Sequence, residues 1–539
     1  MAFQDTTGRR VAAPSGRDRL RTSAPPLCLF VAALAAAVAI IFFSGAMMAL
    51  AATPDYPWLL QAGRRILGEG GLPDRDIFSW TSPDRPWLLY QWSFEAIVAA
   101  LDAALGPVGV LLAFIWAALA LYVLVPLRWL GPRVPVALAV IVAALGLTVV
   151  TVNLSLRPMI VTTAGLLLQH ALVARLRRSE ISIPAAAIAA GALYATWANM
   201  HTGFALGLAA LALTILGDFL ERRGIGAGDG KDRSAPLPPI PLLALLAAAL
   251  VGSLVNPYGW GVHAHLLKLS GSAYFNAHIG ELGSADFHHL QFKLFLLFPV
   301  VLAAALMRAR HAVRPADLLQ LAVLTFATLV ANRFVVWAVI LYVLILPRAM
   351  IAAWPGIGML LPRASDRSFA LLFVFLAAVV PPLLAARGLV NPEGRDCSRF
   401  DRGIRAYAAA QRPSDRLLTD PLTGSCAIGA APGVRVFIDT RFDYYGAAFT
   451  RSLLDALALR PGWSSLLDRW NIDTAVLDRH WPLAELLRID PGWRVLYEDA
   501  QTVVVRRMGP VVGLARLTIS SPVSGGNGIT GTSEGEYGP

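Results

Sequence analysis

Apolar blocks about 16 to 25 residues long, free of Lys, Arg, Asp and Glu in their interior, recur along this chain. A helix of that length crosses a hydrocarbon layer roughly 30 Å thick. Hydrophobic residues make up 56% of the chain and charged residues only 15%, which is more apolar surface than one water-soluble core can bury. We predict a polytopic α-helical membrane protein of about eleven transmembrane helices. The predicted spans are 26–50, 107–126, 134–152, 158–174, 182–198, 203–218, 239–255, 292–307, 315–331, 334–347 and 368–387.

The positions of the basic residues predict how the chain is oriented. With the basic N-terminal segment 1–25 in the cytoplasm, the loops on that side carry twenty Lys and Arg residues, whereas the opposite short loops carry eight. This asymmetry follows the positive-inside rule. The net charge of +11 is therefore an orientation signal, and we expect no nucleic acid partner. We predict a multi-pass protein of the bacterial inner membrane, surrounded by membrane lipids, with its C-terminal part in the periplasm.

Two regions outside the spans have patterns of their own. Within the transmembrane domain 26–388, the first external loop 52–106 contains two stretches that predict helices on the membrane surface. After residue 388 the composition becomes that of a soluble protein, and 389–508 is predicted to be a small α/β periplasmic domain with a terminal hairpin. The polar, Gly-rich tail 509–539 is predicted to be disordered. The strands predicted for the domain are 416–420, 434–440, 473–478, 493–499 and 502–507.

Two of the three cysteines lie in this exported domain. Cys397 and Cys426 can form a disulfide there because the periplasm is oxidising, while Cys28 lies in the first predicted span. The sequence leaves the pairing open.

Polar residues that are unusual for a membrane protein gather at one face of the predicted bundle. They all lie at the predicted periplasmic ends of spans, in loops far apart in the sequence. Acids, bases and cations collected in one layer indicate a site built over the spans. These residues are Asp55, Arg157, Asn199, His201, Asn256, Tyr258, Glu281, Asp286, His288, His289, Asn332 and Arg333.

Several short motifs carry a family resemblance. They are TPDYPWLLQAGRRILGEGGLPDRDIFSW in the first external loop, LRPM, WANMHTGFALG, LVNPYGW and, near the C-terminus, FIDTRFDYYG. Together with the order of loop, spans and exported domain, they resemble the GT-C superfamily of polyprenyl-phosphate-dependent glycosyltransferases. Within it, the chain is similar to a bacterial branch of membrane proteins related to the mannosyl- and aminoarabinosyl-transferases. The resemblance implies a GT-C-like transmembrane domain.

The resemblance also implies a reaction. Asp55 matches the acidic residue of the first loop and would act as general base on an acceptor hydroxyl, while the sugar leaves polyprenyl phosphate with inversion. The leaving phosphate gains charge and needs cations, for which Arg157, Arg333 and His201 are the candidates. The implied donor is a polyprenyl-phosphate-linked sugar, and the acceptor is a lipid, a glycan or a protein on the periplasmic face.

Each of these residues also has a plainer interpretation. Asp55 could cap a helix, and the two arginines could anchor span ends by snorkelling. No cofactor is certain, but a divalent cation is an open alternative, and Asp74 and Asp76 form an Asp-x-Asp pair that could bind it or simply bend the chain. The histidine spacings do not favour zinc. The substrate or metal candidates are Asp74, Asp76, Asn199, Asn256, Tyr258, Glu281, Asp286 and His288.

A second function stays open beside the enzyme. The chain could be a non-catalytic GT-C-like scaffold or binding component of envelope polysaccharide assembly, with envelope-assembly proteins as partners. A transporter is disfavoured, because ionisable sites of transporters lie near the membrane midplane and the charged residues here lie at one surface. In the motif FIDTRFDYYG, called the tail motif below, Asp439, Arg441 and Asp443 could bind a sugar, but we favour a structural ion-pair cluster.

Overall fold

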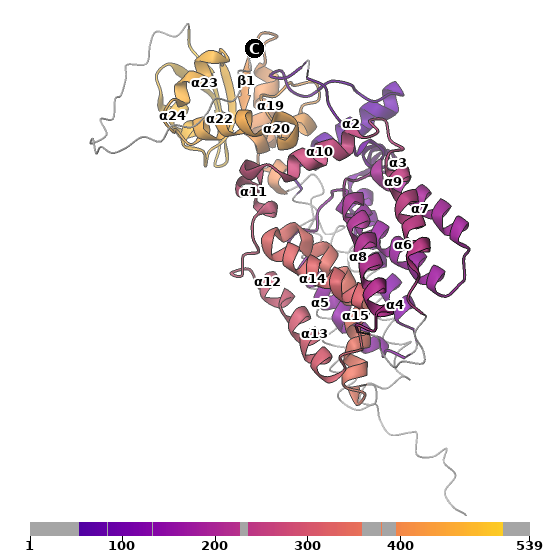
Figure 1. Ribbon diagram of the computed structural model, residues 1–539. Coiled ribbons are helices and arrows are strands. Elements are labelled where there is room, and N and C mark those ends of the chain that lie inside the picture. Colours follow the sequence, from indigo (N-terminus) through magenta and orange to yellow (C-terminus); the bar gives the residue numbers. More distant parts are fainter. Residues whose placement is uncertain are drawn as a thin grey trace, which may run out of the picture.

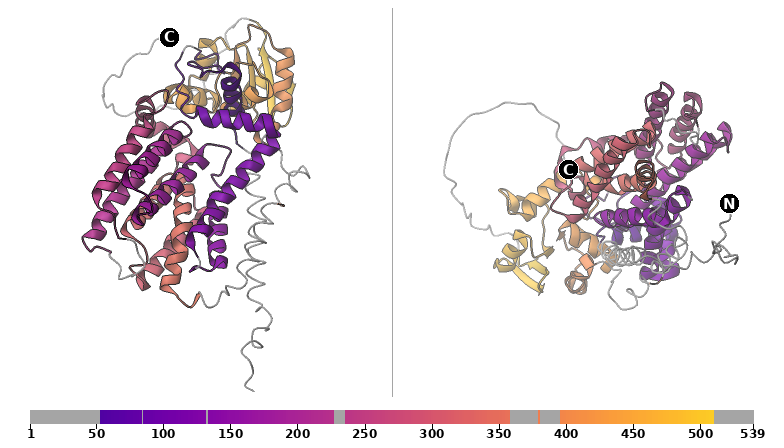
Figure 2. Two further views of the ribbon diagram at one scale, coloured as in Figure 1. Left: turned by 90° about the vertical axis from the view of Figure 1, so that its right-hand side faces the viewer. Right: turned by 90° about the horizontal axis from the view of Figure 1, so that it is seen from below.

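The computed structural model describes residues 53–83, 85–131, 133–226, 235–357, 379 and 395–509. In this part of the chain, a bundle of helices carries a small α/β domain at one end (Figure 1). The left view of Figure 2 shows that domain covering the end of the bundle. The segment 1–25, the predicted spans 26–50 and 368–387 and the predicted disordered tail lie outside the described residues, apart from residues 379 and 509.

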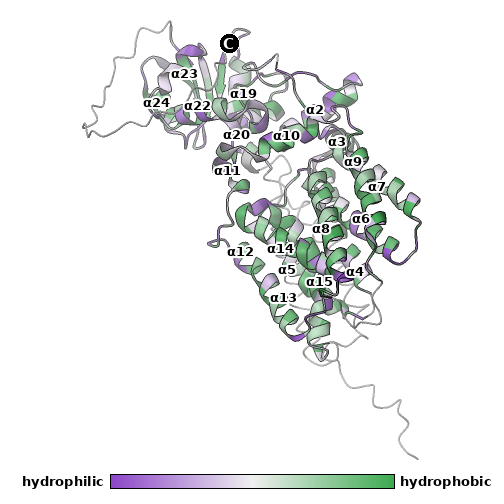
Figure 3. Ribbon diagram, viewed as in Figure 1, coloured by the Kyte–Doolittle hydropathy of each residue, from purple (hydrophilic) through white to green (hydrophobic). Residues whose placement is uncertain are grey.

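The bundle contains helices of very different length. The bounds are α2 Tyr56–Glu69, α3 Trp92–Leu119, η2 Ala120–Leu124, α4 Val125–Leu130, α5 Val136–Val150, α6 Met159–Arg177, α7 Ile183–Ala198, α8 Phe204–Arg222, α9 Pro239–Ser253, α10 Gly261–Ser270, α11 Ala273–His278, η3 Gly280–Leu282, α12 Leu290–Phe295, α13 Leu297–Arg308, α14 Pro315–Val330, η4 Asn332–Phe334 and α15 Val335–Ala353. Most of these helices are strongly hydrophobic along their length (Figure 3).

Five helical segments of the described residues are long and apolar enough to cross a membrane. Four further predicted spans coincide with the shorter apolar helices α5, α7, α9 and α14, which have 15 or 16 residues each. The described residues therefore support a multi-pass membrane protein, whereas the predicted number of eleven spans is not confirmed. The five long segments are Trp92–Leu130, Met159–Arg177, Phe204–Arg222, Leu290–Arg308 and Asn332–Ala353.

The first external loop forms the two predicted surface helices. The first is α2, and the second is the start of α3, which is broken at Gly106 before the predicted span begins. Gly106 has a φ of 68° and Pro107 follows it, so the helix cannot continue straight through this point. The two surface helices pack closely, because a Cβ added to Gly63 would lie 2.0 Å from the Glu95 carbonyl oxygen.

The C-terminal domain contains a four-stranded mixed sheet in the order β1-β2-β4-β3. β1 and β2 are parallel, while β4 is antiparallel to both β2 and β3, so β3 and β4 form the predicted terminal hairpin. The strands are β1 Leu417–Thr419, β2 Thr474–Asp478, β3 Trp493–Glu498 and β4 Thr502–Arg507. The helices are α18 Arg395–Ser398, α19 Asp401–Ala410, α20 Pro421–Ala430, α21 Phe442–Tyr445, α22 Ala447–Leu457, α23 Trp463–Arg469 and α24 Pro482–Ile489.

The strand predicted at 434–440 is wrong. In its place a single parallel bridge joins Val436 to Ser79 of the first external loop. The Val436 amide donates to the Phe78 carbonyl at 2.9 Å, and the Trp80 amide donates to the Val436 carbonyl at 3.1 Å. The backbone groups of Val436 pair with a distant loop, and those of Ile438 bond to the Thr419 side chain of β1 instead of a strand backbone. A local pattern of alternating residues cannot reveal such partners.

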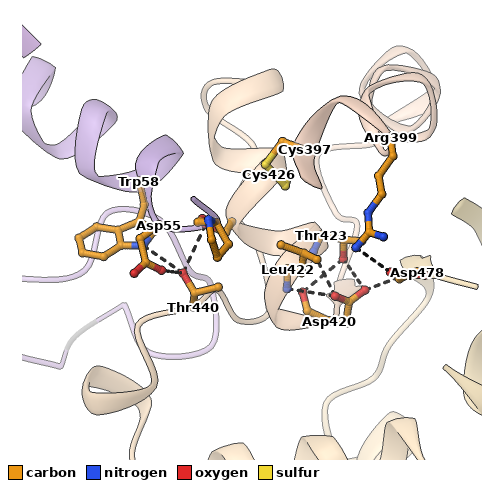
Figure 4. Close-up of a disulfide and its surroundings, with 12 residues drawn as sticks. Asp55, Trp58, Cys397, Arg399, Asp420, Leu422, Thr423, Cys426, Thr440 and Asp478 are labelled. Carbon is orange, nitrogen blue, oxygen red and sulfur yellow. Dashed lines mark hydrogen bonds and ion pairs between the residues drawn. A yellow bond between two sulfur atoms is a disulfide. The ribbon is translucent and has the colours of Figure 1, made fainter. Parts of the chain in front are cut away.

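The first external loop also supplies part of the domain's core. Trp58, Phe78 and Trp87 of the loop are buried in the same cluster as Phe437 and Leu453 of the C-terminal domain. The loop and the domain therefore form one packed unit above the bundle. A disulfide between Cys397 and Cys426 joins α18 to α20 within this unit (Figure 4).

Candidate functional site

Asp55 stands at the N-terminus of α2, but its side chain does not cap the helix. One carboxylate oxygen, Oδ1, accepts a hydrogen bond from the Thr440 hydroxyl of the C-terminal domain. The same Thr440 oxygen accepts a hydrogen bond of 3.1 Å from Nε1 of Trp58 (Figure 4). The carboxylate is thus held at the boundary between the first loop and the C-terminal domain.

The other Asp55 oxygen begins a chain of four alternating charges. Nε of Arg157 lies 2.7 Å from Asp55 Oδ2, and Nη1 of Arg157 lies 2.7 Å from Glu281 Oε2. On the far side of Glu281, its Oε1 lies 3.7 Å from Nη1 of Arg333. The four side chains keep 16 to 25% of their surface exposed, so the network is not sealed from solvent. Four predicted site residues are therefore brought together, with Glu281 linking Arg157 to Arg333.

The four side chains of this charge chain stabilise one another in their ionised forms. Burial alone would lower the pKa of Arg157, but Asp55 and Glu281 outweigh it and hold that pKa above its ordinary value. Burial alone would raise the pKa of Glu281, but Arg157 and Arg333 bring it below the ordinary value. Arg157 and Glu281 are accordingly charged at neutral pH.

Asparagine side chains hold the two short turns that carry Glu281 and Arg333. The Asn153 amide donates to the backbone carbonyl of Asn332 at 3.0 Å and to its side-chain oxygen at 2.9 Å. The Asn332 amide in turn donates to the Gly280 carbonyl at 2.7 Å. These bonds tie η3 and η4 together, so Glu281 and Arg333 are positioned by the backbone that precedes each of them.

His201 does not join the charge chain. Its Nδ1 lies 2.5 Å from the Thr162 hydroxyl and accepts a hydrogen bond of 3.3 Å from the Gly203 amide. Burial and the charge of Arg333 lower the pKa of His201 to about 3. A histidine that is neutral at physiological pH cannot supply the third cation that the sequence predicted for the phosphate.

The two aspartates of the Asp-x-Asp pair have separate environments. Asp74 is exposed, whereas Asp76 is buried and lies 2.8 Å from Nη2 of Arg441. Asp76 also accepts backbone hydrogen bonds from Phe78 and Ser79, at 3.1 and 3.0 Å. The buried member is a structural residue of the loop, and the pair does not present two carboxylates to one ion.

The polar residues of the other loops hold the backbone. Asn199 accepts a 2.8 Å hydrogen bond from the Trp92 indole and donates to the Val255 carbonyl, and Asn256 closes its own turn by bonding to Ser253 and Gly259. The Tyr258 hydroxyl accepts a 3.0 Å bond from the Leu89 amide. Asp286 pairs with the exposed His288 at 2.8 Å. Within the described ranges, no group of three or more His, Cys, Asp or Glu side chains is placed to hold a metal ion.

A second polar group lies beside the charge chain, and the sequence did not assign it to the site. Asp443 of the tail motif lies 3.3 Å from Nε2 of His265 in α10, and its Oδ2 accepts a 3.4 Å hydrogen bond from the Tyr90 hydroxyl. Burial would raise the pKa of Asp443, but the contact with His265 lowers it below the ordinary value overall. Burial raises the pKa of Tyr90 well above its ordinary value, while the charge of Arg333 lowers it and that of Asp55 raises it. The motif FIDTRFDYYG thus supplies Thr440 and Asp443 to the region of Asp55.

Known proteins resemble this chain at the level of structure. No protein-family model and no curated protein matches the chain. Among solved structures, the chain is similar to the oligosaccharyltransferase AglB from Archaeoglobus fulgidus, in complex with an inhibitory peptide and a dolichol-phosphate. The sequence identity is 13% and the TM-score is 0.51, and the similarity covers 92% of this chain and 76% of that chain. Another similar structure is apo ArnT from Cupriavidus metallidurans, with 15% identity, coverage of 91% and 100%, and a TM-score of 0.48. At this identity the similarity to AglB concerns the fold alone, so the chain shares the overall fold of AglB.

Proposed function

We propose that the chain transfers a sugar from a polyprenyl-phosphate donor to a hydroxyl group of a lipid, glycan or protein acceptor on the periplasmic face. The observation that carries the proposal is the charge chain Asp55–Arg157–Glu281–Arg333 beneath the C-terminal domain. It brings a carboxylate and two guanidinium groups from distant loops to one partly exposed place. The GT-C fold, shared with a protein that was solved with a dolichol-phosphate, supports the donor class.

In this proposal Asp55 is the general base. Its carboxylate accepts the proton of the acceptor hydroxyl while the hydroxyl oxygen forms a bond to the sugar C1 atom. The bond between C1 and the phosphate oxygen breaks, and polyprenyl phosphate leaves with the electron pair, which inverts the configuration at C1. General-base catalysis of this kind is typically worth about 10² to 10⁴ in rate.

Both oxygens of Asp55 have a partner in the structure, and the reaction must free one of them. Arg157 is the partner that a donor can attract away from Asp55. The donor phosphate offers the Arg157 guanidinium two oxygens that share a negative charge. A shift of Arg157 from Asp55 toward the donor phosphate would release Oδ2 for the incoming proton. Donor binding would then prepare the base.

The donor phosphate would have to compete with Glu281 for the two arginines. Arg157 and Arg333 both contact Glu281, at 2.7 and 3.7 Å, so the longer contact is the easier one to replace. Arg333 would then stabilise the charge that develops on the leaving phosphate. In this scheme Arg157 occupies the place between Asp55 and Glu281 that a divalent cation could otherwise take.

The pairing of all four charges also favours a second candidate. A network in which every charge has a partner is typical of a purely structural role. A non-catalytic scaffold of envelope polysaccharide assembly would retain such a network for stability. Such a scaffold would bind envelope-assembly proteins and would need no donor.

The test is a transfer assay with the purified full-length protein and polyprenyl-phosphate sugars. We expect Asp55→Asn to lower the rate about 10² to 10⁴-fold, while native mass spectrometry still detects bound undecaprenyl phosphate. Asp74→Asn, a charge-matched change in the same loop at an exposed position, should transfer at the wild-type rate. If Asp55→Asn transfers as well as the wild type, the assignment of the base is wrong. A wild-type protein that neither binds the carrier nor transfers, but co-purifies with envelope proteins, is a scaffold.

A further inference from the structure

A second place with an unusual composition lies at the other end of the bundle. A cavity of about 620 Å³ is bounded by α4, α6, the loop before α14, and α15. A neighbouring cavity of about 430 Å³ shares Trp129, His170, Arg178 and Arg348 with it. α4 and the end of α15 lie away from the C-terminal domain (Figure 1). The proposed transfer reaction uses neither cavity.

Arginine dominates the polar lining of these two cavities. Asp317 is the one acidic side chain among the described residues that line them. Three more carboxylates, Glu180, Asp218 and Glu221, pair with lining arginines from outside. Among the described residues, the seven arginines of the lining therefore outnumber these four carboxylates. The lining arginines are Arg128, Arg133, Arg175, Arg177, Arg178, Arg314 and Arg348.

Arg348 forms its hydrogen bond with an uncharged group. Its Nη2 donates to the backbone carbonyl of Trp129. The Trp129 ring in turn stacks on His170, with a centroid distance of 6.1 Å. The guanidinium is thereby fixed where both cavities meet, and its charge is not neutralised by this contact.

The same cavity has an apolar wall. Leu130, Val134, Leu344 and Ile345 line it alongside the arginines. A small hydrophilic anion would leave that wall in contact with water, whereas an amphiphile with an anionic head would cover both parts. The volume is in the range of about 300 to 1,000 Å³ that is common for ligand sites.

We infer that this cavity binds the phosphodiester headgroup of an anionic phospholipid, with the acyl chains along the apolar wall. The loops at this end are the Arg-rich loops that the positive-inside rule places in the cytoplasm. Anionic lipids of that leaflet are attracted by juxtamembrane basic residues, and arginine binds phosphate oxygens in pairs. The site is independent of the proposed glycosyl transfer.

The test titrates the purified full-length protein with three probes, phosphatidylglycerol, phosphatidylcholine and inorganic phosphate, and follows binding by native mass spectrometry. The double variant Arg178→Gln/Arg348→Gln removes two arginines that line both cavities. We expect its apparent Kd for phosphatidylglycerol to rise about 30-fold. The control Arg222→Gln/Arg308→Gln removes two exposed arginines from the ends of α8 and α13, outside the linings, and should stay within about twofold of the wild type.

The wild-type protein provides an independent measurement in case the variant does not fold. Its affinity for phosphatidylglycerol should exceed that for phosphatidylcholine and should fall as salt rises, since an electrostatic contact is screened. Equal affinity for the two lipids would mean an unspecific apolar cavity and would overturn the inference. Equal affinity for inorganic phosphate would also overturn the inference, because the ligand would then be a free anion. If the double variant binds phosphatidylglycerol as tightly as the wild type, these arginines do not form the binding site and the inference is wrong.

Discussion

Nη2 of Arg441 lies 2.8 Å from Oδ1 of Asp76, although 365 positions separate the two residues in the chain. Both side chains are almost completely buried, with exposures of 2% and 0%. Arg441 also pairs with Asp439 at 2.6 Å, and its guanidinium lies 4.5 Å from the centre of the Trp87 ring. This buried ion pair joins the first external loop to the C-terminal domain.

Loss of Asp76 should therefore destabilise the protein strongly. Asp76→Ala leaves a buried guanidinium with one carboxylate fewer, which typically costs about 3 to 5 kcal/mol. Asp74→Ala, two positions away and exposed, should change the free energy of unfolding by less than about 0.5 kcal/mol. Chemical unfolding in detergent, followed by tryptophan fluorescence, measures both. Equal effects of the two variants would contradict the separate roles of the two aspartates.

Thr440 should matter for the rate of transfer and not for donor affinity. Its hydroxyl donates to Asp55, so Thr440→Val leaves the carboxylate less well oriented. We expect kcat to fall about 10 to 100-fold with KM for the donor unchanged. Thr440→Ser keeps the hydroxyl and should restore most of the rate. A Thr440→Val enzyme with normal kcat would show that this bond does not orient the base.

The Asp443–His265 contact should make stability depend on pH. The contact with His265, together with Arg441, outweighs burial and lowers the pKa of Asp443 in the folded state. A lowered folded pKa stabilises the protein above the ordinary aspartate pKa of about 3.9 and loses that contribution as pH falls through the lowered value. The unfolding midpoint of Asp443→Asn should therefore differ most from the wild type above about pH 5 and approach it below about pH 4. For Asp74→Asn, we expect the difference to be small throughout this range.

The disulfide offers a test of orientation. In a Cys28→Ser background, only Cys397 and Cys426 remain. If the C-terminal domain is exported, protein trapped from cells with a thiol reagent and then denatured should carry no label before reduction and two labels after it. Mass spectrometry counts the labels. Two labels without reduction would place the domain on the reducing side and would contradict the predicted topology.

The local patterns of the chain predicted most of its helices, because hydrophobic runs and amphipathic periods are local properties. The two surface helices, and the break between the second of them and the next apolar segment at Gly106, follow from such patterns. The segment 434–440 was assigned wrongly because its partner is Ser79, far away in the sequence. The helix α10 was not predicted at all, since its short apolar stretch follows a turn-rich motif.

The site was predictable to the extent that its residues are out of place in a membrane protein. Asp55, Arg157 and Arg333 were chosen for that reason, and the structure brings them together. The sequence could not show that Glu281 links the two arginines, because side-chain pairing depends on the packing of loops. Thr440 lay unnoticed in the tail motif for the same reason.

The sharing of one core by the first loop and the C-terminal domain has a consequence for biogenesis. Trp58 and Trp87 leave the ribosome long before the strands that complete their surroundings. At about 5 to 20 residues per second, the 365 positions between Asp76 and Arg441 take roughly 20 to 70 s to synthesise. During that time the loop lacks the part of the shared core that the C-terminal domain supplies. If the loop is exported as predicted, chaperones on that side of the membrane would meet it before the C-terminal domain has been translated.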